Sequence, residues 1–339
     1  MIIQQALKTL MEKQDLSNEQ MEKTMLEIMT GKTTNAQISG FLIALAMKGE
    51  SVNEITSAVR VMRDLSTKLP INTNKPLIDT CGTGGDNLNT FNISTASALV
   101  VASAGIKVAK HGNRSISSKS GSADLLELVG VKIDADLETV VRCIEKVNIG
   151  FMFAPNFHPA MKYAVPVRKE MAVKTIFNIL GPLTNPAGAK RQVLGVFDKS
   201  LQKTMVEVLQ KLGSEHAMSV CADDGLDEIS ISSPTNIVEL VNGSIKEYTI
   251  NPEDFGFKTV DISKIQCHSS EESLDIIQNI LDGKESPAKN IVALNAGAAI
   301  YVSGKKQSLK EGVEMALEIL NSGEAHQKLD DFVRESNGC

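Results

Sequence analysis

The first 66 residues carry the apolar spacing of amphipathic helices. Three patterns of the form S/T-x-x-E/Q begin at Ser17, Thr34 and Ser51, each ahead of an apolar-periodic stretch. In such a pattern the first and fourth side chains cap free backbone N–H groups at a helix start. Apolar residues then recur three and four positions apart, at Ile55, Ala58, Met62 and Leu65. That spacing is typical of a buried helical face, and we therefore predict a helical domain over residues 1–66.

From residue 76 onward, short β-rich runs alternate with helical stretches such as residues 95–104 and 123–128. The expected strands are residues 77–78, 106–109, 150–153, 192–197 and 218–221. This rhythm predicts an α/β fold, in which a helical N-terminal domain precedes a larger domain with a mainly parallel central sheet covered by helices. Residues 237–250 are expected to form an antiparallel hairpin that turns at Asn242 and Gly243.

Composition and charge restrict the function. The chain has 339 residues, of which 42% are apolar and 22% charged, and its net charge is -6. These values are ordinary for a soluble globular protein, and the acidic balance argues against an extended nucleic-acid surface. Residues 40–47 and 291–302 are the most apolar stretches and are too short to span a bilayer. Because the first five residues also lack the charged start of a signal peptide, the expected location is the cytoplasm.

A run of small, polar segments between residues 79 and 127 is suited to a phosphorylated ligand. The glycine-rich segment 79–86 is followed by donor-rich segments at residues 92–95, 110–115 and 117–122. Three glycines, at positions 82, 84 and 85, let the backbone turn sharply and bring N–H groups close to an anion. The segment is neither a dinucleotide fingerprint nor a Walker A loop, because Asn87 and Leu26 stand where these motifs need glycine. A small polyphosphate substrate is therefore predicted.

Three loops are expected to meet at one site. Residues 79–86, 110–115 and 222–228 each follow a predicted strand, and ligands of parallel sheets bind beyond the carboxyl ends of the strands. The third loop places four carboxylates within six residues. Magnesium commonly takes one or two carboxylates together with water and substrate phosphates. Asp227 and Glu228 are therefore candidate metal ligands, and an exposed acidic turn is the alternative interpretation.

An aromatic-rich segment at residues 151–160 has two interpretations. It holds three of the ten Phe residues within seven positions, which fits either core packing around a bend or the apolar wall of a pocket for an aromatic substrate. The guanidinium of Arg168, a few residues on, is suited to a bidentate pair with a substrate carboxylate. His111 could donate to the same carboxylate or order its own loop. Asn92 is expected to cap a helix that starts near Thr95.

Taken together, these segments closely resemble the anthranilate phosphoribosyltransferases of tryptophan biosynthesis, over most of the chain. The matching motifs stand in the family's order: QISGFLIALAMKGE from Gln37, CGTGGD from Cys81, NIST from Asn92, KHGNRSISSKSGSADLLE from Lys110, FMFAPNFHPAMK from Phe151, VRKE from Val167, TIFNILGPLTNP from Thr175 and DGLDEIS from Asp224. A small departure is Met171 and Ala172, where the family usually carries Leu and Gly.

The resemblance implies a homodimeric enzyme of the fold shared with the pyrimidine nucleoside phosphorylases. Residues 1–66 would form the dimerisation domain, completed by a helix near residues 160–180, and residues 73–339 would form the α/β catalytic domain that binds phosphoribosyl pyrophosphate. The enzyme would transfer phosphoribose from phosphoribosyl pyrophosphate to the amine of anthranilate, with Mg²⁺ as its cofactor. The resemblance leaves open an association with a glutamine amidotransferase or anthranilate synthase subunit.

The resemblance also implies the residues of each site. Phosphoribosyl pyrophosphate would contact Gly82, Gly85, Asp86, Thr90, Asn92, Ile93, Ser94, Thr95, Lys110, His111, Gly112, Asn113, Arg114, Ser115, Ile116, Ser117, Ser118 and Ser122. The metal would be held by Ser94, Asp227 and Glu228. Anthranilate would be bound by Gly82, His111, Asn113 and Arg168.

Two other functions are alternatives on the same fold. A pyrimidine nucleoside phosphorylase would take inorganic phosphate and a nucleoside, and the segment at residues 110–127 argues against it. A nucleic-acid-binding paralogue would not turn over substrate. The acidic balance argues against this second alternative, together with the intact CGTGGD and DGLDEIS motifs.

Overall fold

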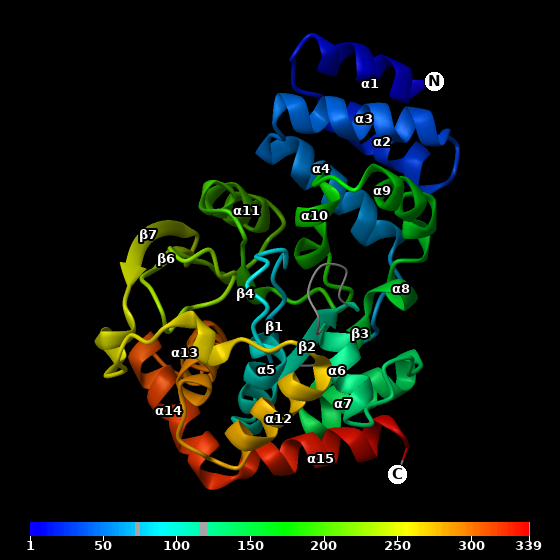
Figure 1. The fold of residues 1–339 in the computed structure, drawn as a ribbon. Helices are drawn as coiled ribbons and strands as arrows, with labels where there is room; N and C mark the ends of the chain where they lie inside the picture. The colour runs from blue at the N-terminus through cyan, green and yellow to red at the C-terminus, as the bar shows by residue number, and fades with distance from the viewer. Residues whose placement is uncertain (72–74, 115–120, 339) are drawn as a thin grey trace.

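The N-terminal part of the chain is a bundle of four helices (Figure 1). The structure is a computed structural model that describes residues 1–71, 75–114 and 121–338. The bundle consists of α1 (Ile2–Met11), α2 (Asn18–Met29), α3 (Asn35–Lys48) and α4 (Val52–Leu65). The capping boxes predicted at Ser17, Thr34 and Ser51 are all formed, and each one starts a helix. The sequence prediction of these three helix starts is therefore confirmed.

Helices from the middle of the chain pack on this bundle. They are α8 (Ala154–Phe157), α9 (Val165–Met171) and α10 (Phe177–Leu180), with 3-10 turns at Pro159–Tyr163 and Gly181–Leu183. Ala164, Val167 and Ile176 are buried in the same apolar cluster as the interior residues of α2, α3 and α4. In Figure 1, α9 and α10 accordingly lie beside α4, between the bundle and the sheet.

The larger part of the chain is built on a seven-stranded sheet with the order β3-β2-β1-β4-β5-β6-β7. Its strands are β1 (Leu77–Asp79), β2 (Lys107–Gly112), β3 (Ile149–Phe153), β4 (Arg191–Gly195), β5 (His216–Ala222), β6 (Thr235–Val241) and β7 (Ser244–Ile250). The first five strands pair in parallel, and β6 and β7 form the antiparallel edge. The predicted hairpin is confirmed, with Asn242 and Gly243 both at positive φ in its turn.

Two helical layers cover the sheet because successive strand residues point to opposite faces. On β4, Val193 packs in the cluster that contains α5 and α13, whereas Leu194 packs in the cluster that contains α11 and the bundle. The helices of this part are α5 (Ile93–Ser103), α6 (Ser122–Leu128), α7 (Leu137–Val147), α11 (Lys199–Lys211), α12 (Ser270–Leu281), α13 (Pro287–Val302), α14 (Leu309–Ser322) and α15 (Glu324–Ser336). Among the described residues, no helix combines the length and apolar character needed to cross a membrane.

The structure corrects the end of the strand that was expected at residues 106–109. Residues 110–112 were expected to begin a loop, but β2 continues through Gly112 because Lys110, His111 and Gly112 pair with Phe151, Met152 and Phe153 of β3. Polar residues in a buried strand escape a prediction that rests on apolar runs, since their burial depends on partners from elsewhere in the chain. Lys110 and His111 therefore lie on the rigid sheet, and the loop starts at Asn113.

Candidate active site

The loops that follow β1 and β5 meet at the carboxyl ends of the parallel strands. The backbone N–H of Gly84 donates a hydrogen bond of 2.7 Å to Oδ2 of Asp227. A Cβ atom at Gly82 would lie 2.9 Å from the same carboxylate oxygen, so the close approach needs glycine there. Gly84 and Gly85 both have positive φ, which is the conformation that their lack of a side chain permits. The glycine-rich loop is thus shaped by its contact with the acidic loop.

Gly195, at the end of β4, is a site residue that sequence reasoning missed. A Cβ atom at this position would lie only 1.7 Å from the backbone oxygen of Asp227. Its own backbone oxygen accepts a hydrogen bond of 2.9 Å from Thr83 N–H. Gly195 therefore lets the loops after β1 and β5 approach the end of β4 together. A single glycine inside an apolar run, between Leu194 and Val196, carries no signal of such a contact.

The two carboxylates of the acidic loop lie in an environment that disfavours their charge. Burial, with Asp86 nearby, raises the pKa of Asp227 to about 7, and the hydrogen bond from Gly84 opposes this shift. Burial and the neighbouring Asp227 likewise raise the pKa of Glu228 well above its ordinary value. A cation bound beside them would restore the ionised forms. The described part of the chain holds no cluster of three or more His, Cys, Asp or Glu side chains arranged for a metal.

A buried lysine supplies positive charge on the strand next to these loops. Lys110 is 2% exposed, and its ammonium donates to Ser94 Oγ at 3.1 Å and to Thr80 at 3.5 Å. Burial lowers the pKa of Lys110, and nearby acidic groups, among them Asp79 and Glu228, oppose this shift. The ammonium is therefore held at the site by neutral oxygens, which leaves capacity for a stronger anionic partner.

Asp79 fixes the register of the strands below the site. Burial raises the pKa of Asp79 to about 6. Its carboxylate accepts hydrogen bonds from His111 N–H at 3.2 Å and from the amide of Asn185 at 2.7 Å. These bonds join β1, β2 and the segment after α10, so Asp79 has a supporting role beneath the ligand-facing loops.

The start of α5 lies against Lys110 of β2. Asn92 caps the helix as predicted, with Oδ1 accepting from Thr95 N–H at 3.1 Å. Ser94 lies in the first turn and contacts Lys110. The hydroxyl of Thr95 is buried and has no hydrogen-bond partner among the described residues. Since Ile93 N–H bonds to the backbone oxygen of Phe91 and Thr95 N–H to Asn92, the N–H of Ser94 is the donor left over in this turn among the described residues. A helix start of this kind favours phosphate.

His111 forms a buried pair with His158, a residue that the sequence reasoning did not select. The ring centroids lie 5.1 Å apart, and both side chains are buried. Burial lowers the pKa of His111 to about 3 and that of His158 to about 4. Both rings are therefore neutral at pH 7. Neither ring nitrogen of His111 makes a well-formed hydrogen bond within the described residues.

Arg168 lies on α9, at the junction of the helical bundle and the sheet. Its guanidinium stacks over the ring of Phe177, 5.5 Å from the centroid, and partial burial lowers its pKa. Within the described part of the chain, the guanidinium has no ion-pair partner. The aromatic segment before it serves mainly the core, since Phe151 and Phe157 are buried in apolar clusters. Core packing is thus the better interpretation for these two rings.

The remaining predicted residues lie on the loop after β2 or near it. Asn113 is exposed, and its side chain accepts from Arg114 N–H at 2.8 Å. The guanidinium of Arg114 is turned toward α6, where it pairs with Asp124 at 3.1 Å and Glu127 at 2.7 Å. Thr90 forms an isolated bridge with Gln266, and Ser122 is the first residue of α6. Ser115, Ile116, Ser117 and Ser118 lie outside the described residues.

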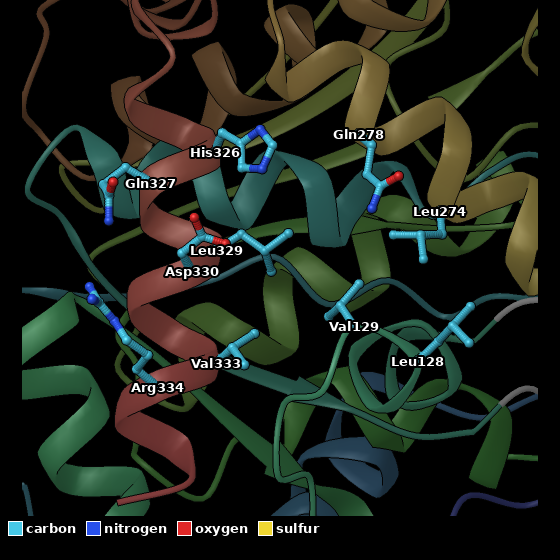
Figure 2. Close-up of a pocket in the computed structure, with 10 residues that line it drawn as sticks. All are labelled: Leu128, Val129, Leu274, Gln278, His326, Gln327, Leu329, Asp330, Val333 and Arg334. Carbon is cyan, nitrogen blue, oxygen red and sulfur yellow. The ribbon is translucent and has the colours of Figure 1, made fainter. Parts of the chain in front are cut away.

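A groove of about 690 Å³ lies elsewhere, and Figure 2 shows the residues that line it. Its walls come from the end of α6, from α12 and from α15, with Leu128, Leu274 and Val333 as apolar members. None of the predicted site residues lines it. The candidate active site is therefore the cluster of loops at the strand ends.

Comparisons with known proteins show the family to which the chain belongs. Residues 4–66 match the helical bundle domain of the glycosyl transferase family, and residues 74–326 match the a/b domain of that family. The chain is 58% identical to the anthranilate phosphoribosyltransferase of Vesicomyosocius okutanii over 100% of both chains. It is 57% identical to that of a Marinomonas species over 98% of this chain and 96% of the relative.

Solved structures give the same result. The anthranilate phosphoribosyltransferase of Thermus thermophilus superposes with a TM-score of 0.92 at 41% identity, over 98% of this chain and 99% of the other. The Saccharomyces cerevisiae enzyme, solved in complex with phosphoribosyl pyrophosphate and magnesium, superposes with a TM-score of 0.91 at 27% identity. The match covers 99% of this chain and 98% of the yeast chain. The chain therefore belongs to the anthranilate phosphoribosyltransferases, within the glycosyl transferase family.

Proposed function

We propose that the chain transfers phosphoribose from phosphoribosyl pyrophosphate to the amine of anthranilate, which gives N-(5-phosphoribosyl)anthranilate and pyrophosphate. The observation that carries this proposal is the contact between the glycine-rich loop and Asp227, beside the buried ammonium of Lys110. It places backbone N–H groups, a cation and two carboxylates at the strand ends. This combination suits a diphosphate ester with a divalent metal.

Phosphoribosyl pyrophosphate binds, in this proposal, between the glycine-rich loop and the start of α5. Gly82, Gly85 and Asp86 would face one side of the substrate. On the other side, the first turn of α5 from Asn92 to Thr95 would offer the N–H of Ser94 and the unpartnered hydroxyl of Thr95 as donors among the described residues. Lys110 on β2 contributes the positive charge of its ammonium. The homologous yeast enzyme has been solved with this substrate and magnesium, which supports the placement by family relationship.

Ser94, Asp227 and Glu228 fit the ligand set of Mg²⁺. All three offer oxygen atoms, and the raised pKa values of the two carboxylates follow from burial without enough neighbouring positive charge. Magnesium accepts few protein ligands and completes its shell with water and substrate phosphates. When bound, the metal would neutralise charge on the diphosphate leaving group.

Anthranilate, in this proposal, is held by Arg168 and Asn113, with Gly82 and His111 nearby. The guanidinium of Arg168 is free among the described residues to pair with the carboxylate of anthranilate. The neutral ring of His111 retains one N–H for a hydrogen bond, since burial lowers its pKa to about 3. Holding the aromatic amine in line with the sugar is a contribution from proximity and orientation.

The reaction needs stabilised charge more than proton transfer. The bond from C1 of the ribose to the pyrophosphate oxygen breaks, and its electron pair leaves with pyrophosphate. The amine nitrogen then bonds to C1 and loses one proton. An aromatic amine is neutral at pH 7, so no strong base has to activate it. Lys110 and the backbone N–H groups of the glycine-rich loop stabilise the leaving group electrostatically.

We also propose that the helical bundle forms a homodimer. Several large apolar residues of the bundle are exposed, namely Met1, Met11, Leu26, Ile43 and Met47. Met47 is 83% exposed and lies one turn after Ile43 on α3. Covering such residues is the usual drive for association. The molecular mass from light scattering, for the wild type and for Met47→Lys, tests the dimer. The same measurement with an added anthranilate synthase subunit tests the expected association.

A stoichiometric assay tests the proposed reaction. With anthranilate, phosphoribosyl pyrophosphate and Mg²⁺, one pyrophosphate should be released for each anthranilate consumed, and mass spectrometry should find N-(5-phosphoribosyl)anthranilate. Phosphorolysis of thymidine or uridine without consumption of anthranilate would contradict the proposal.

A further inference from the structure

Lys174 connects the helical side of the molecule to the glycine-rich loop. It lies between α9 and α10, just after Ala172 ends α9 in the left-handed conformation with φ 50°. The next helix start is fixed by Asn178, whose side chain accepts from Thr175 N–H at 2.9 Å. The short segment that carries Lys174 is therefore held at both ends.

The ammonium of Lys174 contacts the glycine-rich loop directly. Nζ lies 3.5 Å from the backbone oxygen of Gly85 and 3.6 Å from the ring centroid of Phe197. Phe197 is itself joined to the loop, because its N–H donates to Thr83 Oγ1 at 3.1 Å. Lys174 thus lies against two residues that belong to the glycine-rich loop or are bonded to it.

These contacts are weak partners for a full positive charge. A carbonyl oxygen at 3.5 Å is at the limit of hydrogen bonding, and a ring face offers only a cation–π attraction. Lys174 has no carboxylate at ion-pair distance within the described ranges. A phosphate oxygen is a stronger partner for an ammonium than either contact. The side chain is also exposed, so it can move toward a ligand at low cost.

We propose that Lys174 binds the diphosphate of phosphoribosyl pyrophosphate and is a further substrate-binding residue of the site. This inference rests on the proposed function. The same short segment follows α9, which carries Arg168, so an anion bound by Lys174 also tethers the helix that presents the guanidinium. Lys174 is in this way the link between the two substrate subsites.

Calorimetric titration of the protein with inorganic pyrophosphate and Mg²⁺ measures directly how much Lys174 contributes to diphosphate binding. Lys174→Met should raise the Kd for pyrophosphate about tenfold or more, because one charge-assisted contact is lost. The KM for phosphoribosyl pyrophosphate should rise by a similar factor. Lys174→Arg should stay within about threefold of wild type, since it keeps the charge.

Lys162 offers a matched control. It is an exposed lysine of the same connecting region, and its ammonium lies over the ring of Tyr163 at 5.1 Å. Lys162→Met removes an equivalent charge and cation–π contact without touching the glycine-rich loop, so its pyrophosphate affinity should equal that of wild type. Equal melting curves for both Met variants would exclude unfolding as the cause.

Two outcomes separate the inference from the function on which it rests. If the wild type transfers phosphoribose but Lys174→Met binds pyrophosphate as tightly as Lys162→Met, the role of Lys174 is overturned alone. If the folded wild type neither binds pyrophosphate nor consumes anthranilate, both the proposed function and the role of Lys174 are overturned.

Discussion

The backbone N–H of Gly84 donates a hydrogen bond of 2.7 Å to the carboxylate of Asp227, across 143 positions of the chain. This bond joins the loop after β1 to the loop after β5. It also gives Asp227 two roles, since the same carboxylate shapes the glycine-rich loop and is a candidate metal ligand. Substitutions here must keep the first role in order to test the second.

The paired substitution Asp227→Asn with Glu228→Gln meets that condition. Asn keeps an oxygen that accepts from Gly84, whereas both negative charges are lost. We expect the Mg²⁺ concentration for half-maximal activity to rise at least about tenfold, because two charged metal ligands become neutral. A magnesium titration of the transferase rate measures this, and circular dichroism should show an unchanged fold.

Asp223→Asn is the matched control for the acidic loop. Asp223 lies four residues before Asp227, is exposed, and accepts from the amide of Asn236. Its magnesium dependence should equal that of wild type. Unchanged magnesium dependence in the double variant as well would remove Asp227 and Glu228 from the metal site.

Arg168→Ala tests the anthranilate subsite. Loss of a bidentate pair with a carboxylate should raise the KM for anthranilate about 30-fold, whereas the KM for phosphoribosyl pyrophosphate should stay within about twofold. Steady-state kinetics with each substrate varied in turn give both values. Lys169→Ala, the exposed neighbour on α9, is the control. Equal effects of Arg168→Ala on the two KM values would contradict the assignment.

The buried histidine pair predicts an acid-dependent loss of stability. Burial lowers the pKa of His158 to about 4 in the folded protein, against an ordinary value of 6.5. The unfolded chain therefore binds more protons between these values, and stability falls as the pH drops below about 6.5. At pH 5 this group alone should cost about 2 kcal/mol relative to pH 7.5.

Urea unfolding of wild type and His158→Gln at pH 7.5 and pH 5 isolates that contribution. Comparison with the variant cancels groups that titrate in the opposite sense, such as Asp79, whose pKa burial raises to about 6. On going from pH 7.5 to pH 5, the wild type should lose about 2 kcal/mol more unfolding free energy than the variant loses. If the difference in unfolding free energy between the two proteins is the same at both pH values, the pKa of His158 is not lowered in the folded protein.

A second stability prediction concerns Glu54 in the helical bundle. Its buried carboxylate accepts from Leu16 N–H at 2.9 Å, Ser51 N–H at 2.8 Å and the ammonium of Lys48 at 2.7 Å. Glu54→Ala removes all three bonds and leaves the Lys48 ammonium with Asp15 as its ion-pair partner, and should cost about 3 kcal/mol of unfolding free energy. The double variant with Lys48→Met should lose less than the sum of the two single losses, because the bond between the two side chains can be lost only once. Additive effects would contradict the coupling.

Much of the fold could be predicted from the sequence because its signals are local. A capping box such as Ser51 with Glu54 lies within four residues, and the hairpin turn at Asn242 and Gly243 depends on backbone freedom at two positions. The sequence reasoning assigned Glu54 only to that cap. Its bonds to Leu16 and Lys48 depend on how the helices pack, so they could not be predicted.

The candidate site likewise has features that the sequence predicts and features that it does not. The glycine-rich and acidic loops are recognisable from composition, and strand order explains why they meet. Contacts between distant segments have no comparable signal. Gly195 approaches Asp227 across 32 positions, His158 lies against His111 from another element, and Lys174 reaches Gly85 across 89 positions. A lone glycine, histidine or lysine acquires such a role only when the chain is folded.

The fluorescence of anthranilate followed over time is the most direct test of the central claim. The chain has no Trp, so its own emission interferes little. With phosphoribosyl pyrophosphate and Mg²⁺ present, the signal should fall as anthranilate is consumed, and omitting phosphoribosyl pyrophosphate or adding EDTA should stop the fall. A constant signal from folded protein with both substrates and metal would contradict the assignment of this site as a phosphoribosyltransferase.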